Sequence, residues 1–442
     1  MIETYHLRNI EIQLVDLETL QITSNIFSIL VGKNGTGKST LLGDLTKDIS
    51  HGIERYRRQL KNRKLPLGFF PVEVIAVSTS PFDKFPLVRS DRFPNYTYLG
   101  LRDLHSSNFG LAYLSKIIAS LIECVSKEEL QAKEIAIVLD YLGYRDDILM
   151  RFESLHTRGF LEVIAHEENI IELIESRPTA SGSRRLNKAF FLNQDDSINK
   201  KRASRLQDIA RKAVTDSSFR LRFEIMLNRN GLSVGHDESE DILFLIQAGV
   251  VRLRDVLLVS IDGNEPFSIK DASSGEQSII LSILGIASKI KNNSLICIDE
   301  PEICLHPQWQ EKYIEILTRT FSRYENCHFI IATHSPHVIS KLSNINSFVV
   351  DLESGVTKNA NQFTKHSADY QLANVFDFPG YKNEYLSRIA LNTFVKVSKN
   401  KRFDDEDLLH FEKLKKQSKY LDTSDPVYDL YLALERLGEE YA

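Results

Sequence analysis

Long apolar runs are absent from this 442-residue sequence. No stretch approaches the roughly 20 apolar residues that a membrane-spanning helix needs. The first residues, MIETYHLRNI, also lack the apolar core of a secretion signal. We therefore expect a soluble, cytoplasmic protein that has no membrane partner.

Closely spaced cysteines and a surplus of basic charge are missing as well. The chain has four cysteines and no CxxC pair, which argues against a disulfide framework and a structural zinc site. It has 55 Lys and Arg against 60 Asp and Glu, a net charge of −5. Nucleic-acid binding would therefore have to come from a local basic patch, because the chain as a whole does not attract phosphates.

What the sequence does contain is a glycine-rich loop between an apolar strand and a helix, FSILVGKNGTGKSTLL, at residues 27–42. It fits the pattern GxxxxGK[ST] at every fixed position. Glycines let backbone N–H groups close around phosphate oxygens, and the following lysine and serine suit the phosphates and Mg²⁺. A chance glycine-rich turn is the alternative. The predicted nucleotide-binding residues of this loop are Gly32, Lys33, Asn34, Gly35, Thr36, Gly37, Lys38, Ser39 and Thr40.

Two later apolar strands end in residues that suit the same chemistry. The strand at 295–298 is followed by Asp299 and Glu300. Asp299 is expected to hold Mg²⁺ together with Ser39, and Glu300 to polarise the attacking water. The strand at 329–332 is followed by His334, which suits contact with a γ-phosphate. The alternatives are a solvated pair of acids and a structural histidine.

A second candidate anion site lies at residues 272–280, ASSGEQSII. Two serines and a glycine precede a helix-periodic apolar run, where free backbone N–H groups can meet an anion. The alternative is a plain helix cap. The residues predicted to contact nucleotide here are Ser273, Ser274, Gly275 and Glu276.

The order of these motifs resembles the ABC-type ATPase heads of the SMC, RecF and OLD superfamily. They are a Walker A loop (32–39), an SSGE signature (273–276), a Walker B strand with its glutamate (295–300) and a strand-end histidine. Ala272 replaces the leucine usual in the signature. The resemblance implies ATP and Mg²⁺ as cofactors. It also implies a homodimer, or a multiple of dimers, in which each signature meets the ATP on the facing head.

Three stretches narrow the resemblance, namely VIAVSTSPFDKFP (74–86), DEPEICLHPQWQ (299–310) and ATHSP (332–336). They resemble stand-alone ATPases of bacterial anti-phage defence, such as PtuA of Septu and retron systems or AriA of PARIS systems. This implies an ATPase, without nuclease activity of its own, that regulates a separate effector. The effector would be a PtuB-like HNH nuclease or a TOPRIM protein.

The fold expected is α/β: an ABC-type P-loop ATPase head over 1–350 with a helical insertion at about 101–215. Residues 351–442 are expected to form a mainly helical C-terminal module for assembly or partner binding. No sustained heptad pattern predicts the coiled-coil arm of SMC proteins. The acidic run Asp404 to Asp407 is expected to begin a helix, the alternative being a metal-dependent nuclease site.

Two basic clusters, at 55–64 and 200–212, keep a second hypothesis open. Either cluster could bind a phosphate backbone, and the chain would then be a RecF-like DNA-repair ATPase that binds DNA directly. Contact with retron DNA or RNA, or with phage DNA, is also compatible with the defence hypothesis. The alternative is that each cluster is a solvated helix face.

Overall fold

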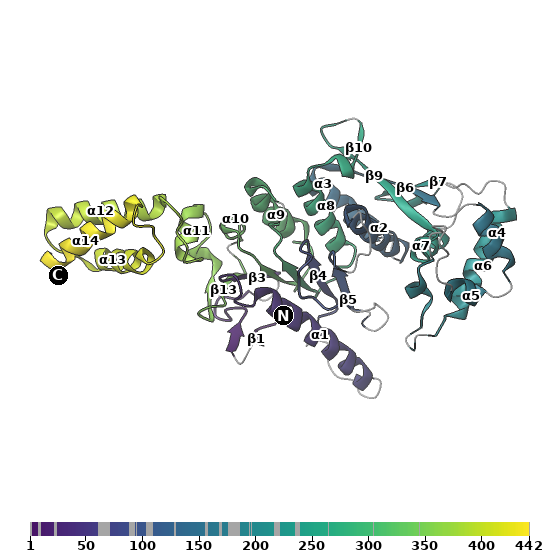
Figure 1. Ribbon diagram of the computed structural model, residues 1–442, viewed down its shortest axis with the longest axis horizontal. Helices are drawn as coiled ribbons and strands as arrows, with labels where there is room; N and C mark the ends of the chain where they lie inside the picture. The colour runs from purple at the N-terminus through teal and green to yellow at the C-terminus, as the bar shows by residue number, and fades with distance from the viewer. Residues whose placement is uncertain are drawn as a thin grey trace.

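The computed structural model describes residues 2–441 except 8–9, 22–23, 61–70, 88–92, 94, 103–108, 128–129, 155–157, 168–169, 176–185, 194, 196, 216–221, 235–238, 264, 304 and 344. The molecule is elongated. A helical module at the C-terminus forms one end and a small helical cap forms the other, with the sheets between them (Figure 1).

A seven-stranded sheet forms the centre of the fold, in the order β14-β13-β3-β12-β11-β4-β5. All neighbouring strands are parallel except the antiparallel pair β13 and β14. Strands β3, β4, β11 and β12 are buried at every position, which explains why their sequences are mainly apolar. The predicted α/β P-loop fold is confirmed. The strands are β3 (Ile26–Val31), β4 (Val74–Ser78), β5 (Tyr96–Leu99), β11 (Leu295–Asp299), β12 (His328–Ala332), β13 (Ser347–Asp351) and β14 (Val356–Asn359).

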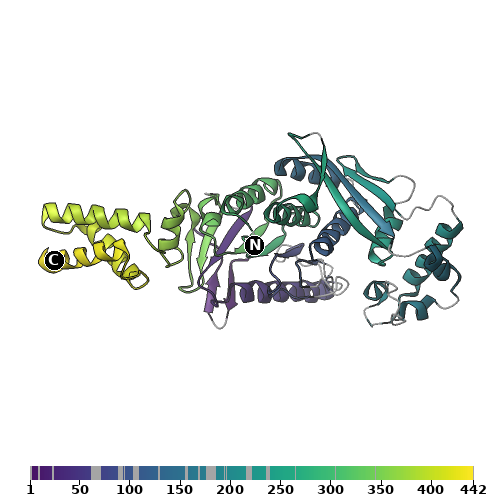
Figure 2. The same cartoon turned by 45° about the horizontal axis from the view of Figure 1, so that its top comes forward.

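Helices cover both faces of this sheet, and successive strand residues point to opposite sides. Leu30 of β3 packs with Leu41 and Leu42 of α1 on one face, whereas Ile29 joins the core formed with α2, α3, α8 and α9 on the other. Figure 2 shows α1 running below the sheet and α8 and α9 above it. These helices are α1 (Lys38–Leu60), α2 (Phe109–Lys127), α3 (Leu130–Leu142), α8 (Ser274–Ala287) and α9 (Pro307–Thr320).

A second sheet is antiparallel, in the order β10-β9-β6-β7-β8. Alternate residues of its central strand, Ile148, Met150 and Phe152, are buried in the same core as α2 and α3. The two sheets and the helices between them therefore form one head. Its strands are β6 (Tyr144–Ser154), β7 (Arg222–Asn228), β8 (Gly231–Val234), β9 (Val251–Ser260) and β10 (Pro266–Ser268).

The stretch 101–215, expected as one helical insertion, is helical only in part. It contains β6, the central strand of the antiparallel sheet, and α2 and α3 belong to the core of the head. A separate small core surrounds Phe191, Leu206 and Phe244. The helices of this cap are α4 (Arg158–His166), α5 (Ile170–Glu175), η2 (Lys188–Phe191), α6 (Lys200–Thr215) and α7 (Ser239–Gln247).

The C-terminal module has its own core around Leu386, Leu414 and Val427. Because β14 still pairs in the central sheet, the head extends beyond the expected boundary at residue 350. Asp404 and Asp407 form a capping box, so the predicted helix start in the acidic run is confirmed. The elements here are η4 (Ala360–Gln362), α11 (Ala368–Asn374), α12 (Glu384–Asn400), α13 (Asp405–Ser418) and α14 (Pro426–Tyr441).

The first two strands pair as an antiparallel hairpin. Three cysteines carry free thiols, and Cys304 lies outside the residues that the structure describes. Over the described part of the chain, every helix falls short of the length and hydrophobicity needed to cross a bilayer. The remaining elements are β1 (Thr4–Leu7), β2 (Ile10–Gln13), η3 (Ile269–Asp271) and α10 (Pro336–Ser340).

Candidate nucleotide-binding site

Three sequence motifs meet at one edge of the central sheet. Strands β3, β12 and β11 are neighbours and parallel, so their carboxyl ends lie side by side. The Walker A loop follows β3, Asp299 and Glu300 lie at the end of β11, and His334 follows β12. This edge is where open α/β sheets bind ligands.

The Walker A loop is shaped for an anion at the N-terminus of α1. Gly32, Gly35 and Gly37 have φ values of 145°, 85° and 100°, which side-chain-bearing residues rarely adopt. A Cβ on Gly32 would also lie 2.9 Å from Thr36 Oγ1. The tight turn therefore requires glycine. The long helix α1 begins directly after the turn, and its first backbone N–H groups are suited to bind phosphate.

The Lys38 ammonium lies across the loop. Its Nζ donates to the carbonyl of Gly32 at 2.8 Å and to that of Lys33 at 3.2 Å. Burial lowers the pKa of Lys38, and the nearby carboxylates of Glu300 and Asp299 act in the opposite direction. A buried cation framed by a glycine-rich loop is suited to receive phosphate charge.

Ser39 and Asp299 are joined by a hydrogen bond of 3.0 Å from Ser39 Oγ to Asp299 Oδ1. Burial raises the pKa of Asp299 to about 7; the Ser39 hydrogen bond opposes this, and Glu300, Asp83 and Glu302 add to it. A half-buried hydroxyl and a buried carboxylate among further carboxylates form a hard oxygen environment that fits Mg²⁺. Within the described residues, no three His, Cys, Asp or Glu side chains form a metal site of their own. Phosphate oxygens and water would have to complete the shell.

Glu300 and His334 face each other at the edge of the sheet, with 3.8 Å between His334 Nε2 and Glu300 Oε1. Glu300 has a left-handed φ of 49°, and its N–H donates to the carbonyl of Ala332 at 2.9 Å. Such strained residues cluster at functional sites. Burial lowers the pKa of His334, and Lys38 adds to the effect, so the imidazole is neutral near pH 7.

Sequence reasoning assigned no role to Glu302, yet the structure ties it to the histidine. Glu302 Oε1 accepts a hydrogen bond of 2.5 Å from the backbone N–H of His334. The pKa of Glu302 is raised, chiefly by burial. The pairing joins two different strand ends, so spacing along the chain gave no signal for it.

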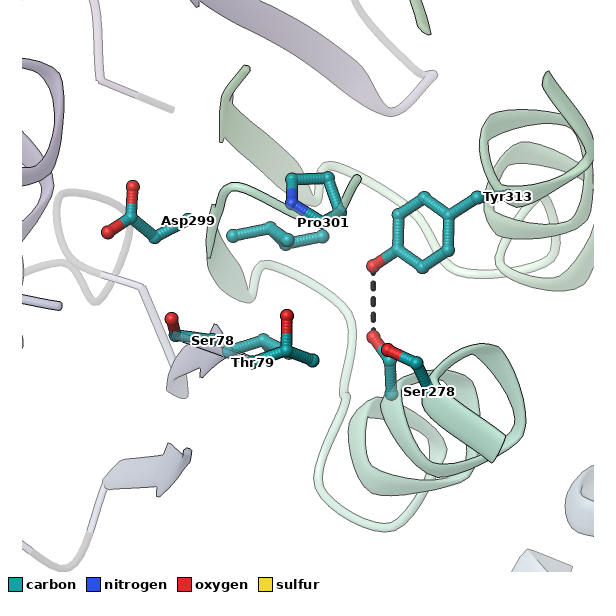
Figure 3. A pocket seen from close by; sticks show the side chains of 9 residues that line it. Ser78, Thr79, Ser278, Asp299, Pro301 and Tyr313 are labelled. Atoms are coloured by element: carbon teal, nitrogen blue, oxygen red, sulfur yellow. Dashed lines mark hydrogen bonds between the residues drawn. The ribbon is translucent and has the colours of Figure 1, made fainter. Parts of the chain in front are cut away.

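A small pocket beside Asp299 is lined by hydroxyl groups (Figure 3). Nothing in the sequence indicated this pocket. Ser78 is in register with Asp299 on the neighbouring strand. The buried Oγ1 of Thr79 has no hydrogen-bond partner within the described residues. Across the pocket, Ser282 Oγ of α8 lies 2.9 Å from the hydroxyl of Tyr313. The pocket thus connects the Walker B strand with the helix that begins at the signature.

In the signature, Ser273 is the N-cap of α8, and its hydroxyl accepts from the N–H of Glu276 at 3.2 Å. The plain capping role is therefore present. Ser273 and Ser274 are also exposed, whereas Gly275 is buried. Glu276 accepts a hydrogen bond of 2.5 Å from Tyr144 of β6. Contact of this exposed helix start with a second copy stays a prediction.

Much of the second basic cluster has partners within the chain. Arg202 donates to the carbonyl of Phe190, and Arg205 pairs with Asp241 at 3.0 Å. These contacts hold α6 within the cap and favour a structural role. Lys200 and Lys201 are exposed at the start of the helix. The side chains of the first cluster, at 55–64, lie outside the described residues.

Comparison with known proteins agrees with this geometry. Residues 140–340 match the family described as "AAA domain, putative AbiEii toxin, Type IV TA system". The match includes the signature, Walker B and His334 and excludes the Walker A loop.

Three curated relatives are similar over longer or shorter parts of the chain. The Retron Ec83 probable ATPase of Escherichia coli is 22% identical over 367 residues, 73% of this chain and 66% of that protein. The Retron Vc95 probable ATPase of Vibrio cholerae serotype O1 biovar El Tor is 31% identical over 109 residues, 22% of this chain and 21% of that protein. Endonuclease GajA of Bacillus cereus (strain HuB5-5) is 23% identical over 411 residues, 77% of this chain and 57% of that protein. The chain thus spans less than two thirds of the length of each of these relatives.

Proposed function

We propose that this chain, which carries a P-loop ATPase domain of the AAA type, binds ATP with Mg²⁺ and hydrolyses it. One observation carries the proposal: Lys38, Ser39, Asp299, Glu300 and His334 lie at or after the carboxyl ends of three neighbouring parallel strands and meet at one edge of the sheet. A neutralising lysine, oxygen ligands for a cation and a carboxylate beside a neutral histidine are the parts that phosphoryl transfer to water requires.

Each residue has a distinct part in this proposal. Lys38 neutralises the phosphates, and Ser39 and Asp299 hold Mg²⁺, which when bound offsets negative charge on phosphate oxygens. Glu300 accepts a proton from the attacking water or orients it. Neutral His334 donates a hydrogen bond toward the γ-phosphate while Glu302 holds its backbone.

We further propose that two heads join head to tail around ATP. The exposed Ser273 and Ser274 at the start of α8 would meet the nucleotide on the facing copy. Glu276 is held by Tyr144, so the signature is supported by the antiparallel sheet. ATP would then stabilise the dimer, and hydrolysis would release it.

The proposed role is regulation of a separate effector nuclease in anti-phage defence. Two relatives are described as probable ATPases of retrons, and a third as an endonuclease. In this chain Asp404 and Asp407 form a capping box, and both pair with Lys396. These acidic groups are engaged in folding the module, which supports the proposal that the nuclease chemistry belongs to a partner.

Complementation between two inactive variants tests the head-to-tail site. Lys38→Ala removes the Walker A cation, and Ser273→Arg blocks the signature, so each protein alone should hydrolyse ATP poorly. In a 1:1 mixture about half of the dimers are mixed, and each mixed dimer has one intact composite site. About one quarter of the wild-type sites should then return. No recovery would exclude a shared site, and wild-type turnover by Lys38→Ala alone would overturn the ATPase proposal.

A RecF-like DNA-repair ATPase is the second candidate, favoured by exposed Lys200 and Lys201. Reversing both charges should reduce ATP-dependent DNA binding and flatten its salt dependence if this surface contacts phosphates. Unchanged binding would exclude α6 as the contact.

Purified protein incubated with DNA and Mg²⁺ or Mn²⁺ tests its own nuclease activity, and we expect no cleavage.

A further inference from the structure

The C-terminal module reaches back to the Walker A loop. Tyr420, in the link between α13 and α14, places its hydroxyl 3.5 Å from Lys33 Nζ. The same ammonium lies 5.1 Å from the centre of the Tyr420 ring, which is within the range of a cation–π contact. The two residues are 387 positions apart. A module that is otherwise placed at one end of the molecule therefore contacts the loop that binds phosphate (Figure 1).

Lys33 is fixed to the head as well. Glu353, just after β13, accepts from the Lys33 backbone N–H at 2.8 Å, and its other oxygen lies 3.6 Å from Lys33 Nζ. The carbonyl of Lys33 in turn accepts from Lys38 Nζ at 3.2 Å and from Thr36 Oγ1 at 2.9 Å. A continuous set of contacts thus runs from Tyr420 through Lys33 to the phosphate-binding lysine.

Tyr420 is itself held by contacts from the end of α13 to α11 and to the segment that follows α11. Gln417 donates from Nε2 to the carbonyl of Ala373 at 2.8 Å, and Lys416 pairs with Asp377 at 2.8 Å. The N–H of Tyr420 donates to the carbonyl of Gln417 at 2.9 Å. The position of the tyrosine therefore follows the position of the whole module.

The module also connects to the opposite side of the site. Helix α11 packs on α10, which begins two residues after His334. The N–H of Lys365 donates to the carbonyl of Ser340, the last residue of α10, at 3.1 Å. The module is thus connected both to the Walker A loop and to the helix that follows the histidine.

We propose that Tyr420 is a positioning residue of the nucleotide site, which holds the Walker A loop through Lys33 and couples the position of the C-terminal module to ATP affinity. The inference rests on the proposed ATPase function and adds a means of regulation. Because coupling is reciprocal, ATP would stabilise the docked module, and a protein that moved the module would weaken ATP binding by the same factor.

Three substitutions separate the coupling from a general effect on folding. Tyr420→Ala removes ring and hydroxyl, Tyr420→Phe keeps the ring, and Tyr381→Ala is the matched control. Tyr381 is also an exposed module tyrosine with a lysine near its ring, Lys382 at 5.3 Å, but that lysine belongs to the module. We expect Tyr420→Ala to raise the Kd and KM for ATP about threefold with kcat unchanged, and Tyr420→Phe to recover most of the affinity. Equal affinities for Tyr420→Ala, Tyr381→Ala and the wild type would overturn the proposal.

A double-mutant cycle tests whether the effect passes through Lys33. Lys33→Gln alone should weaken ATP binding to the same extent as Tyr420→Ala, and adding Tyr420→Ala to Lys33→Gln should cause no further loss. A full additional loss would show that Tyr420 acts elsewhere and would overturn the mechanism. If Tyr420→Ala unfolds the module, Tyr420→Phe and Lys33→Gln decide the outcome, since Lys33 lies on the head and is partly exposed.

Hydrogen exchange gives a readout that is independent of turnover. Saturating ATP and Mg²⁺ should slow amide exchange around residues 417–425 in the wild type and leave it unchanged in Lys33→Gln. If the wild type does not bind ATP at all, the proposed function fails. If it binds ATP, Lys38→Ala does not, and exchange in the module is unaffected, only the coupling fails.

Discussion

Asp299, which we propose as a Mg²⁺ ligand, should lower the stability of the free protein. Its carboxylate is buried beside Glu300 and Glu302, and its pKa is raised from 3.8 to about 7. A raised carboxyl pKa means that the folded state disfavours the ionised form. The penalty is absent at pH values below the unfolded pKa, increases as the pH rises from the unfolded pKa to the folded pKa, and is constant above the folded pKa.

The size of the effect follows from linkage. The carboxyl has a pKa of 3.8 in the unfolded state and of about 7 in the folded state. Each pKa unit corresponds to about 1.4 kcal/mol, so ionisation of Asp299 at pH 8 destabilises the folded state by about 4 kcal/mol. At pH 5 the cost falls to less than half of that, because the folded carboxyl is protonated. Asp299→Asn keeps the shape and an acceptor for Ser39, and it removes the charge. We therefore expect this variant to be more stable than the wild type at pH 8, by up to about 4 kcal/mol, with the gap narrowing at pH 5.

Chemical denaturation of both proteins at pH 5 and pH 8, without nucleotide, measures the gap. Asp83→Asn is the matched control, because Asp83 is also buried but pairs with Arg102 at 2.9 Å and accepts from Tyr98 at 2.6 Å. Removing that charge should destabilise the protein. The reasoning is refuted if Asp299→Asn is the less stable protein at pH 8. Mg²⁺-dependent ATP binding should fall in Asp299→Asn whatever its stability.

Three smaller changes test other parts of the site. Gly32→Ala should weaken ATP binding about tenfold, because of the φ of 145° and the close approach to Thr36, and titration with a fluorescent nucleotide measures it. Tyr144→Phe leaves Glu276 without its donor and should weaken ATP-dependent dimerisation, which light scattering follows, at a cost of about 1 kcal/mol. Glu302→Ala should lower kcat about tenfold through the released histidine backbone, whereas Glu302→Gln, which keeps an acceptor, should stay near the wild type; a steady-state ATPase assay compares them.

Local sequence was enough to predict the strands and loops that carry the site. The Walker A glycines form a tight turn because the required backbone angles are coded by consecutive residues. The buried strands β3, β11 and β12 were evident from their mainly apolar sequences, and the polar residues after them had to share an edge once the strands were parallel. The capped start of α13 was also evident, since Asp404 and Asp407 have capping-box spacing.

The span 101–215 was predicted as a helical insertion, but it contains strand β6. The helical periodicity of the sequences on both sides of β6 favoured a helical interpretation of the whole span. Strand β6 is stabilised as a strand by its hydrogen bonds to β7 and β9. The residues of β7 and β9 lie 68 or more positions away along the chain. Its buried residues, Ile148, Met150 and Phe152, occupy alternate positions, but the apolar Leu149 between two of them interrupts the apolar–polar alternation that would identify a strand. Helices α2 and α3 then pack into the core between the sheets instead of forming an insertion.

The sequence by itself determined the groups on which the proposed chemistry depends: a glycine-rich loop that fits phosphate, a strand-end acid pair and a histidine, each specified by neighbouring residues. Only the tertiary structure decided which distant groups position that chemistry. Glu302 meets the N–H of His334, and Tyr420 meets Lys33 across 387 positions. Such contacts depend on how whole elements pack, and the packing is a property of the assembled core that no local stretch of the chain encodes.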